Sequence, residues 1–355
     1  MKAKKLSALL LAVVMIFSLA ACGSKTPKTD PNATRIFTDS TGREVEVPAQ
    51  IDKVALSGPL AQIVLFALCP DKLVGVSNAW SSEAQEFLDE KYFNMPQIGQ
   101  LYGGKGELNL ETLLQSGAQV VIDVGESKGS IKGDMDSLQQ QTGIPFVHIS
   151  ADMQSYPQAY RMLGDLLGMK TEAEALATYC EKIYSRTETI ASGVEKANVL
   201  YVTGDMGQNV IAKGSYHAEI LDMLTNNLAQ VDEPSSKGTG NEVSMEQILT
   251  WNPDVVIFAP ESIYATVRDD AAWQSVTAIK NGAYYEVPFG PYNWMGFPPS
   301  VQRHLGMVWL SKLLYPDATA DYDLFADVQE YYKLFYHCDI TRAQYDALVA
   351  NSIGK

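Results

Sequence analysis

Cysteine and histidine are scarce in this chain, with four of each among 355 residues. The spacing of the cysteines fits neither a zinc ribbon nor a redox Cys-x-x-Cys pair, and the sequence contains no His-Glu-x-x-His motif. These absences argue against the common zinc and thiol-redox classes, and the sequence predicts no metal site and no cofactor. One disulfide among Cys69, Cys180 and Cys338 would leave an odd thiol, and the sequence does not select a pair.

Positive charge is also in short supply. The chain has 27 Lys and Arg against 42 Asp and Glu, a formal net charge of −15. A strongly acidic protein is repelled by phosphate backbones and by anionic lipid, so we expect no nucleic-acid partner and no broad electrostatic adhesion to membranes.

Long apolar runs are absent after the first twenty residues. The chain opens with Lys2, Lys4 and Lys5, followed by an apolar run that ends in Leu-Ala-Ala-Cys22. This pattern predicts a lipoprotein signal peptide over 1–21, lipidation of Cys22 and a polar tether over 22–34. We therefore expect a protein that is lipid-anchored on the outer face of a bacterial cytoplasmic membrane.

One segment of the sequence occurs twice. Residues 108–124 read LNLETLLQSGAQVVIDV, and residues 243–259 read VSMEQILTWNPDVVIFA. In both copies a glutamate, Glu111 or Glu246, stands nine residues before a Val-Val-Ile run and two residues after a helix-capping residue. Each copy predicts a capped helix that leads into a buried strand. Two similar lobes explain the repeat, and chance similarity between ordinary helix–strand units is the alternative.

Strand and helix patterns alternate on both sides of one long helical stretch. We expect an N-terminal α/β lobe over 35–169, a connecting helix over 170–196 and a C-terminal α/β lobe with closing helices over 197–355. The predicted fold is two Rossmann-like lobes with mainly parallel sheets and a ligand cleft between them. The predicted strands are 53–57, 73–77, 119–124, 145–149, 198–203, 209–212, 254–258 and 284–287.

Ligands of open α/β sheets bind outside the carboxyl ends of the strands, so the loops after the strands hold the candidate ligand contacts. Aromatic and amide side chains recur there, which suits a flat or bulky ligand. A structural role at the lobe edges is the alternative for some of these residues. The predicted ligand-binding residues are Ser57, Trp80, Tyr102, Tyr216, His217, Tyr264, Tyr292, Asn293 and Trp294.

The paired glutamates predict a docking surface. A carboxylate in the first turn of a helix is favoured by the helix dipole, which explains either one alone. Equivalent placement in both lobes is better explained by a two-fold partner that engages Glu111 and Glu246 through basic side chains.

The combined motifs resemble class III substrate-binding proteins, the iron-chelate and cobalamin binders of ABC importers. The resemblance rests on the lipobox, VALSGPLAQIVLFALCPDKLVGVS, both repeats, and WQSVTAIKNGAYYEVP over 273–288, and it covers nearly all of 35–340. It implies that Glu111 and Glu246 dock with arginines of the permease dimer, which works with its ATPase. It also implies that Trp294 contacts the ligand.

We therefore predict a non-enzymatic, monomeric solute receptor whose cargo is a metal chelate, foremost an iron(III)–siderophore complex. A corrinoid or haem in the same role is the first alternative. An exported lipoprotein enzyme is the alternative from another class.

Overall fold

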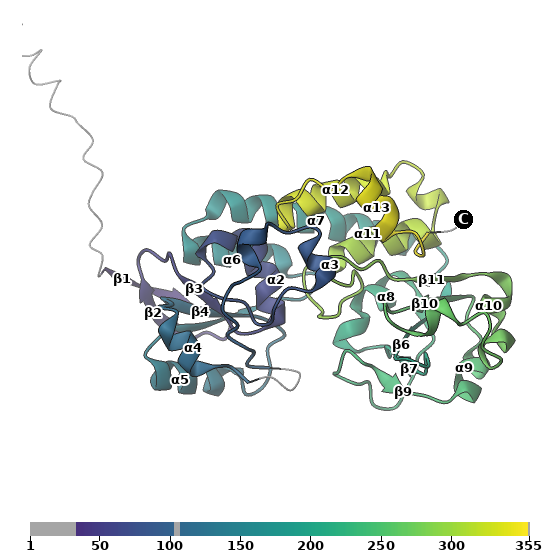
Figure 1. Cartoon of the computed structure of the whole chain (residues 1–355), viewed down its shortest axis with the longest axis horizontal. Helices are drawn as coiled ribbons and strands as arrows, with labels where there is room; N and C mark the ends of the chain where they lie inside the picture. Colours follow the sequence, from purple (N-terminus) through teal and green to yellow (C-terminus); the bar gives the residue numbers. More distant parts are fainter. Residues whose placement is uncertain (1–32, 103–106, 354–355) are drawn as a thin grey trace, which may run out of the picture.

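Two α/β lobes lie side by side in the computed structural model, which describes residues 33–102 and 107–353 (Figure 1). The predicted fold class is confirmed, with a parallel sheet in the N-terminal lobe and one long helix that runs along both lobes. The predicted signal peptide and the lipidation residue Cys22 lie outside the described residues.

The N-terminal lobe begins with a hairpin and continues as a small parallel sheet. The hairpin pairs β1 (Thr34–Thr38) with β2 (Glu44–Pro48). The sheet has the order β3-β4-β5, and its strands are Val54–Leu56, Val120–Gly125 and Phe146–Ser150. The helices of this lobe are α2 (Pro59–Leu68), α3 (Ser82–Gln85), α4 (Leu110–Gln115), α5 (Ile131–Thr142) and α6 (Tyr156–Leu167).

The strand predicted at 73–77 is wrong. Only two isolated bridges form there, Leu73 with Val54 and Val76 with Gln97. The intervening Gly75 lies so close to Ile98 that a Cβ atom would come within 2.6 Å of its side chain. Glycine weakens the interior of a strand. At this position the absence of a side chain lets the segment around Ile98 approach closely, and no continuous sheet pairing with another described segment forms.

The C-terminal lobe has a mixed sheet with the order β11-β10-β6-β7-β9, and β8 pairs with the other edge of β6. The parallel strands are β6 (Asn198–Thr203), β8 (Asn226–Asn227), β10 (Val255–Phe258) and β11 (Tyr284–Glu286). The antiparallel additions are β7 (Asn209–Val210) and β9 (Asn241–Glu242). The short helices are α8 (Glu219–Leu224), α9 (Met245–Trp251) and α10 (Thr277–Asn281).

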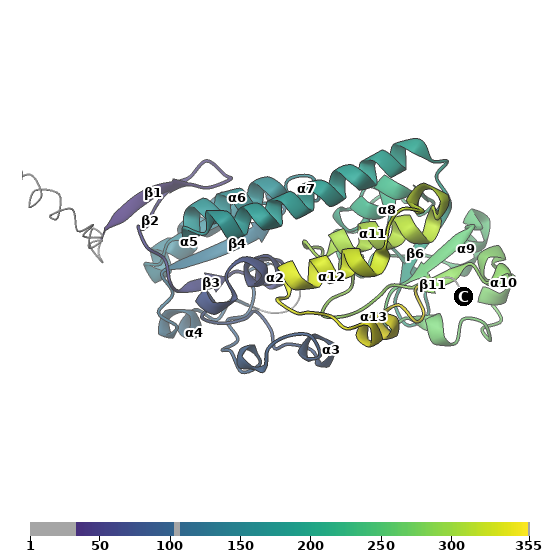
Figure 2. The ribbon, with the colours of Figure 1, turned by 90° about the horizontal axis from the view of Figure 1, so that it is seen from above.

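Four helices join the lobes. The 24-residue α7 (Lys170–Gly193) packs on α6 of the first lobe and on α8 of the second. The closing helices are α11 (Arg303–Leu314), α12 (Leu324–Phe335) and α13 (Arg342–Leu348). Figure 2 shows α12 extending from the C-terminal lobe towards α2 of the N-terminal lobe, and these two helices are in contact.

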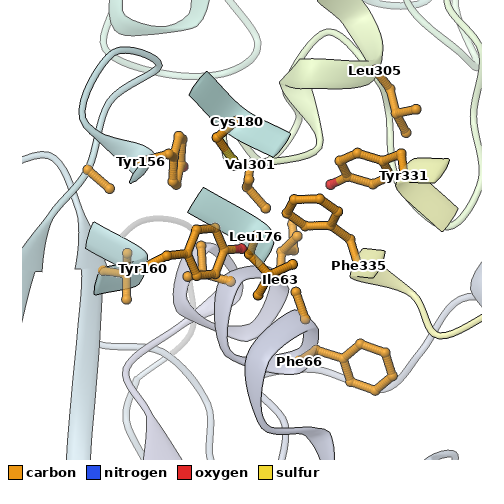
Figure 3. Close-up of a cluster of buried hydrophobic side chains, with 14 of the residues drawn as sticks. Ile63, Phe66, Tyr156, Tyr160, Leu176, Cys180, Val301, Leu305, Tyr331 and Phe335 are labelled. Carbon is orange, nitrogen blue, oxygen red and sulfur yellow. The ribbon is translucent and has the colours of Figure 1, made fainter. Parts of the chain in front are cut away.

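One apolar core continues through both lobes. Figure 3 shows side chains from α2, α6, α7, α11 and α12 meeting in a single cluster. At its centre the rings of Tyr331 and Phe335 stack with centroids 4.2 Å apart, and the ring of Tyr179 packs edge-on against both. Packing of this kind resists relative movement of the lobes, because a shift would break contacts on several helices at once.

Cys69 and Cys180 are buried in this core, Cys338 is half-buried, and none of these three forms a disulfide. Burial raises the pKa of the Cys69 thiol to about 12, which keeps it protonated and unreactive. Within residues 33–102 and 107–353, every helix is too short or too polar to cross a membrane.

The buried His304 makes stability depend on pH. Its Nδ1 donates to the carbonyl of Val301 at 2.9 Å, and burial lowers its pKa from the ordinary 6.5 to about 4. Between these two pKa values the imidazole is protonated in the unfolded chain and neutral in the folded chain. The free energy of unfolding therefore falls as pH drops from 6.5 towards 4, by roughly 3 kcal/mol at most from this group.

We expect His304→Asn to flatten that part of the pH dependence. The free energy of unfolding is measured by denaturant unfolding at pH 7 and at pH 5 for both proteins. The carboxylates are the same in both, so their effect cancels when the two pH-dependent changes are subtracted. An equal loss of stability in the two proteins would show that His304 is not the responsible group.

Candidate functional site

The two repeats form the same local structure. The side chain of Asn109 caps α4 by accepting from the Thr112 amide at 3.0 Å, and Ser244 caps α9 by accepting from the Gln247 amide at 3.2 Å. Each helix is followed by a left-handed residue, Gly117 (φ 68°) or Asn252 (φ 42°). Glycine and asparagine are the residues that tolerate this conformation, which explains why the turn keeps its shape although its sequence differs.

Each repeat helix exposes one acidic and one apolar side chain on the same face. Glu111 and Glu246 are exposed, and Leu114 and Leu249 follow them by three residues with 52% and 39% of their surface exposed. Residues three apart on a helix are neighbours, so each lobe presents a Glu–Leu pair to solvent. We call these the two docking pairs.

A hydrogen-bonded network lies at the carboxyl edge of the N-terminal sheet. The Asp123 carboxylate, near the end of β4, accepts from the hydroxyl of Ser57 and from Nδ1 of His148 at 2.6 Å. The other ring nitrogen of His148, Nε2, lies 3.0 Å from the Ser127 hydroxyl, and Ser150 lies 2.5 Å from Ser127. Asp123 and His148 are buried, whereas Ser127 is exposed, so the network leads from the core to the surface.

His148 was not among the predicted site residues, and its link to the exposed Ser127 was not predicted. The signal was present in the sequence: Gly125-Glu126-Ser127-Lys128-Gly129 matches the Gly-x-Ser-x-Gly pattern, and it stands between a buried strand and a helix. What the sequence did not provide is the pairing of β4 with β5, which sets Asp123 opposite His148.

The C-terminal lobe faces this edge through the segment that holds Tyr216 and His217. The Tyr216 hydroxyl donates to the carbonyl of Ala151, directly after β5, at 2.8 Å, and so links the lobes. Burial lowers the pKa of His217, and the Glu126 carboxylate of the opposite lobe acts against that shift. The predicted ligand residues Ser57, Tyr216 and His217 therefore lie near the boundary between the lobes.

A buried arginine that the sequence analysis did not single out lies beneath Tyr216. Nη1 of Arg303 is 2.8 Å from the Tyr216 carbonyl and 2.6 Å from the Glu219 carboxylate, and the guanidinium lies 4.8 Å from the centre of the Tyr216 ring. Nε and Nη2 of Arg303 have no hydrogen-bond partner among the described residues. Its position at the start of an apolar helix was the available signal, because an arginine is rarely fully buried without a partner, which here is Glu219.

Other predicted ligand residues support the fold where they stand. Trp80 donates to the Tyr92 carbonyl at 3.0 Å, and Tyr292 accepts from Gln62 at 3.2 Å. Asn293 and Trp294 are buried in the loop that precedes α11, and burial raises the pKa of Tyr292. Contact of these residues with a cargo remains a prediction, and it requires the loop to move.

The last two predicted aromatics lie in different surroundings. Tyr264 packs on Phe258 and Tyr284 in the core of the C-terminal lobe, with ring centroids 6.0 and 5.6 Å away. Tyr102 remains at the edge of the N-terminal lobe, where its hydroxyl donates to Asp134 at 2.6 Å and Lys128 lies 4.2 Å from its ring centre.

Within the described parts of the chain, no three His, Cys, Asp or Glu side chains gather as a metal site. A surface groove of about 740 Å³ runs along α7 and α12, well away from the network, and is lined by residues that include Lys170, Glu174 and Glu330.

The comparisons with known proteins agree with this architecture. The family model described as periplasmic binding protein matches residues 54–290. The molybdate-binding protein MolA of Haemophilus influenzae is 24% identical over 348 residues, which cover 90% of this chain and 95% of that protein. A solute-binding protein of an ABC transporter from Sulfurospirillum deleyianum superposes with a TM-score of 0.81 at 25% identity and covers 89% of this chain and 99% of its own.

A periplasmic solute-binding protein from Veillonella parvula has a TM-score of 0.74 at 24% identity, with 90% and 98% of the two chains covered. The matched family model spans more than half of the sequence. The chain belongs to the periplasmic binding protein family and is a solute-binding component of an ABC importer.

Proposed function

We propose that the cargo of this receptor is a small oxyanion of the molybdate class. The observation that carries the proposal is the set of polar groups at the lobe boundary. Ser127 and Ser150 supply hydroxyls from the N-terminal lobe. Arg303 of the C-terminal lobe is fully buried beneath Tyr216 and holds two guanidinium nitrogens without a hydrogen-bond partner among the described residues, which a cargo reaches once the Tyr216 segment moves. Hydroxyl and guanidinium donors are the groups that bind tetrahedral oxyanions.

Two further observations support a small cargo. The rings that were predicted to cover a bulky ligand, those of Trp80, Tyr292 and Trp294, are engaged in the core or in its loops. The Tyr216–Ala151 hydrogen bond also draws the two lobes together at the boundary. The similarity over almost the whole chain to a protein named for binding molybdate is in keeping with this size.

A metal chelate, foremost an iron(III)–siderophore complex, is the second candidate. Phe297 supports it, because 57% of its surface is exposed close to His217 and Gly238. An exposed ring next to a histidine suits a cargo with an apolar face, which a bare oxyanion lacks. A corrinoid or haem would use the same surface.

Calorimetric titration of the purified protein decides between these cargoes. We expect saturable binding of molybdate or tungstate and no heat from ferric siderophores, cobinamide, cobalamin or haemin. Ser150→Ala should weaken oxyanion affinity by roughly 10-fold or more, since a hydrogen bond to a charged group contributes about 1.5–3 kcal/mol.

Ser137→Ala is the matched control, because Ser137 is an exposed serine on α5 whose hydroxyl accepts from Gln141. Binding of a chelate, with no heat from any oxyanion, would contradict the oxyanion proposal and favour the metal chelate as cargo.

The same proposal includes the partners of the receptor. We infer that lipid on Cys22 holds the protein at the membrane. We also infer that each docking pair binds one half of a permease dimer. The equal local structure of α4 and α9 supports a partner with two-fold symmetry.

A further inference from the structure

We propose that Ser127 is the nucleophile of an acyl-transfer centre, with His148 as its base and Asp123 as the group that orients the base. This activity goes beyond capture and delivery of a cargo, and it would use the same Ser127 hydroxyl that the proposed oxyanion site includes. The substrate class is a small carboxylic ester that reaches the lobe boundary.

The distances meet the requirements of such a centre. A nucleophile must lie within hydrogen-bond reach of its base, and a third group must hold the base. Ser127 Oγ is 3.0 Å from His148 Nε2, and His148 Nδ1 is 2.6 Å from Asp123 Oδ2. The carboxylate accepts the Nδ1 hydrogen, which leaves Nε2 with the free electron pair that a base needs.

The surroundings hold this arrangement in place. The second oxygen of Asp123 accepts from Ser57, so the carboxylate is fixed from two sides. His148 is fully buried inside β5, and its backbone amide donates to Asp39 at 3.3 Å. Arg43 pairs with Asp39 at 3.0 Å, which leaves Asp123 as the carboxylate paired with the imidazole ring. Ser127 alone among the three proposed groups is exposed.

The backbone around Ser127 fits the same role. Strand β4 ends at Gly125, whose φ of 143° is unfavourable for other residues, and the 12-residue helix α5 begins at Ile131. The amides of Lys128 and Gly129, which immediately precede α5, donate no hydrogen bond to another described residue. The amide of the residue after a nucleophilic serine, here Lys128, is the position from which a Gly-x-Ser-x-Gly turn stabilises the oxygen of a tetrahedral intermediate.

The reaction balances with water as the only co-reactant. Ser127 Oγ attacks the ester carbonyl and forms a new C–O bond while its proton moves to His148 Nε2. The ester C–O bond then breaks, and the alcohol leaves with that proton. Water, deprotonated by His148, attacks the acyl-serine and releases the carboxylic acid, and the proton returns to Ser127.

The full chain should be tested with a fluorophosphonate probe and with p-nitrophenyl acetate. We expect one covalent label per chain, mapped to Ser127 by peptide mass spectrometry, and release of p-nitrophenolate above the buffer rate. Ser127→Ala should remove both signals, and Ser137→Ala should keep both. His148→Gln should slow labelling by roughly 100-fold or more, the usual share of a general base.

Absence of a label on Ser127 under conditions that label a serine hydrolase control would overturn the proposal. Equal labelling of Ser127→Ala would overturn it as well, and the network would then serve only to satisfy the buried His148. If circular dichroism shows that His148→Gln does not fold, the comparison of Ser127→Ala with Ser137→Ala still decides. The cargo titration is read independently of either result.

Discussion

Reversing both docking glutamates, Glu111→Lys together with Glu246→Lys, should reduce cargo uptake to the level of cells without the receptor. Like charges placed opposite one another at an interface cost several kilocalories per mole, which corresponds to roughly 100-fold or more in receptor–permease affinity. Cargo affinity should not change, because both side chains are exposed on helices α4 and α9, away from the lobe boundary. Uptake of labelled cargo and calorimetry of the purified variant provide the two measurements.

The matched control reverses two exposed glutamates of α7, Glu172→Lys and Glu188→Lys, which changes the net charge equally. This control should transport normally. If the control also fails, the loss reflects overall charge and not docking. Loss of cargo affinity in the first variant would contradict the assignment of Glu111 and Glu246 to the permease.

Truncating Phe335 to alanine should lower the free energy of unfolding by about 3–5 kcal/mol. Its ring is fully buried, stacks on Tyr331 and packs against Tyr160 and Tyr179 from two other helices. Since these helices serve both lobes, we expect the lobes to unfold together in the variant and in the unaltered chain. Urea unfolding followed by circular dichroism and by tryptophan fluorescence should give coincident transitions.

Lys333→Ala on the same helix is the control, because Lys333 is exposed and its truncation should change stability by less than about 0.5 kcal/mol. Two separate transitions, or a loss confined to one spectroscopic probe, would show that the lobes have independent cores.

The repeats and the fold class were predictable because they depend on local signals. Caps such as Asn109 and Ser244, and apolar runs such as Val255–Phe258, act within a few residues of their own position. The site was harder, because it depends on contacts between distant segments. The opposition of Asp123 and His148 follows from strand pairing, and the placement of Arg303 follows from the packing of α11 beside Tyr216.

The burial of the aromatic side chains in the loop before α11 could likewise not be predicted from the sequence. Glycine and proline next to Tyr292 and Trp294 indicate a stiff loop, but they do not say which surface covers it. The loop is covered by the closing helices, since the Tyr332 hydroxyl of α12 donates to the Gly290 carbonyl within it.

The continuous core has a kinetic consequence for transport. Because α7 and α12 pack across both lobes, we expect the distance between Glu111 and Glu246 to change little when cargo binds. On the proposed docking, empty and loaded receptors would offer the permease nearly the same two contacts and would compete for the same binding surface. Transport should therefore slow when empty receptor is in excess. Additional receptor should raise the transport rate only while the ratio of receptor to permease stays low.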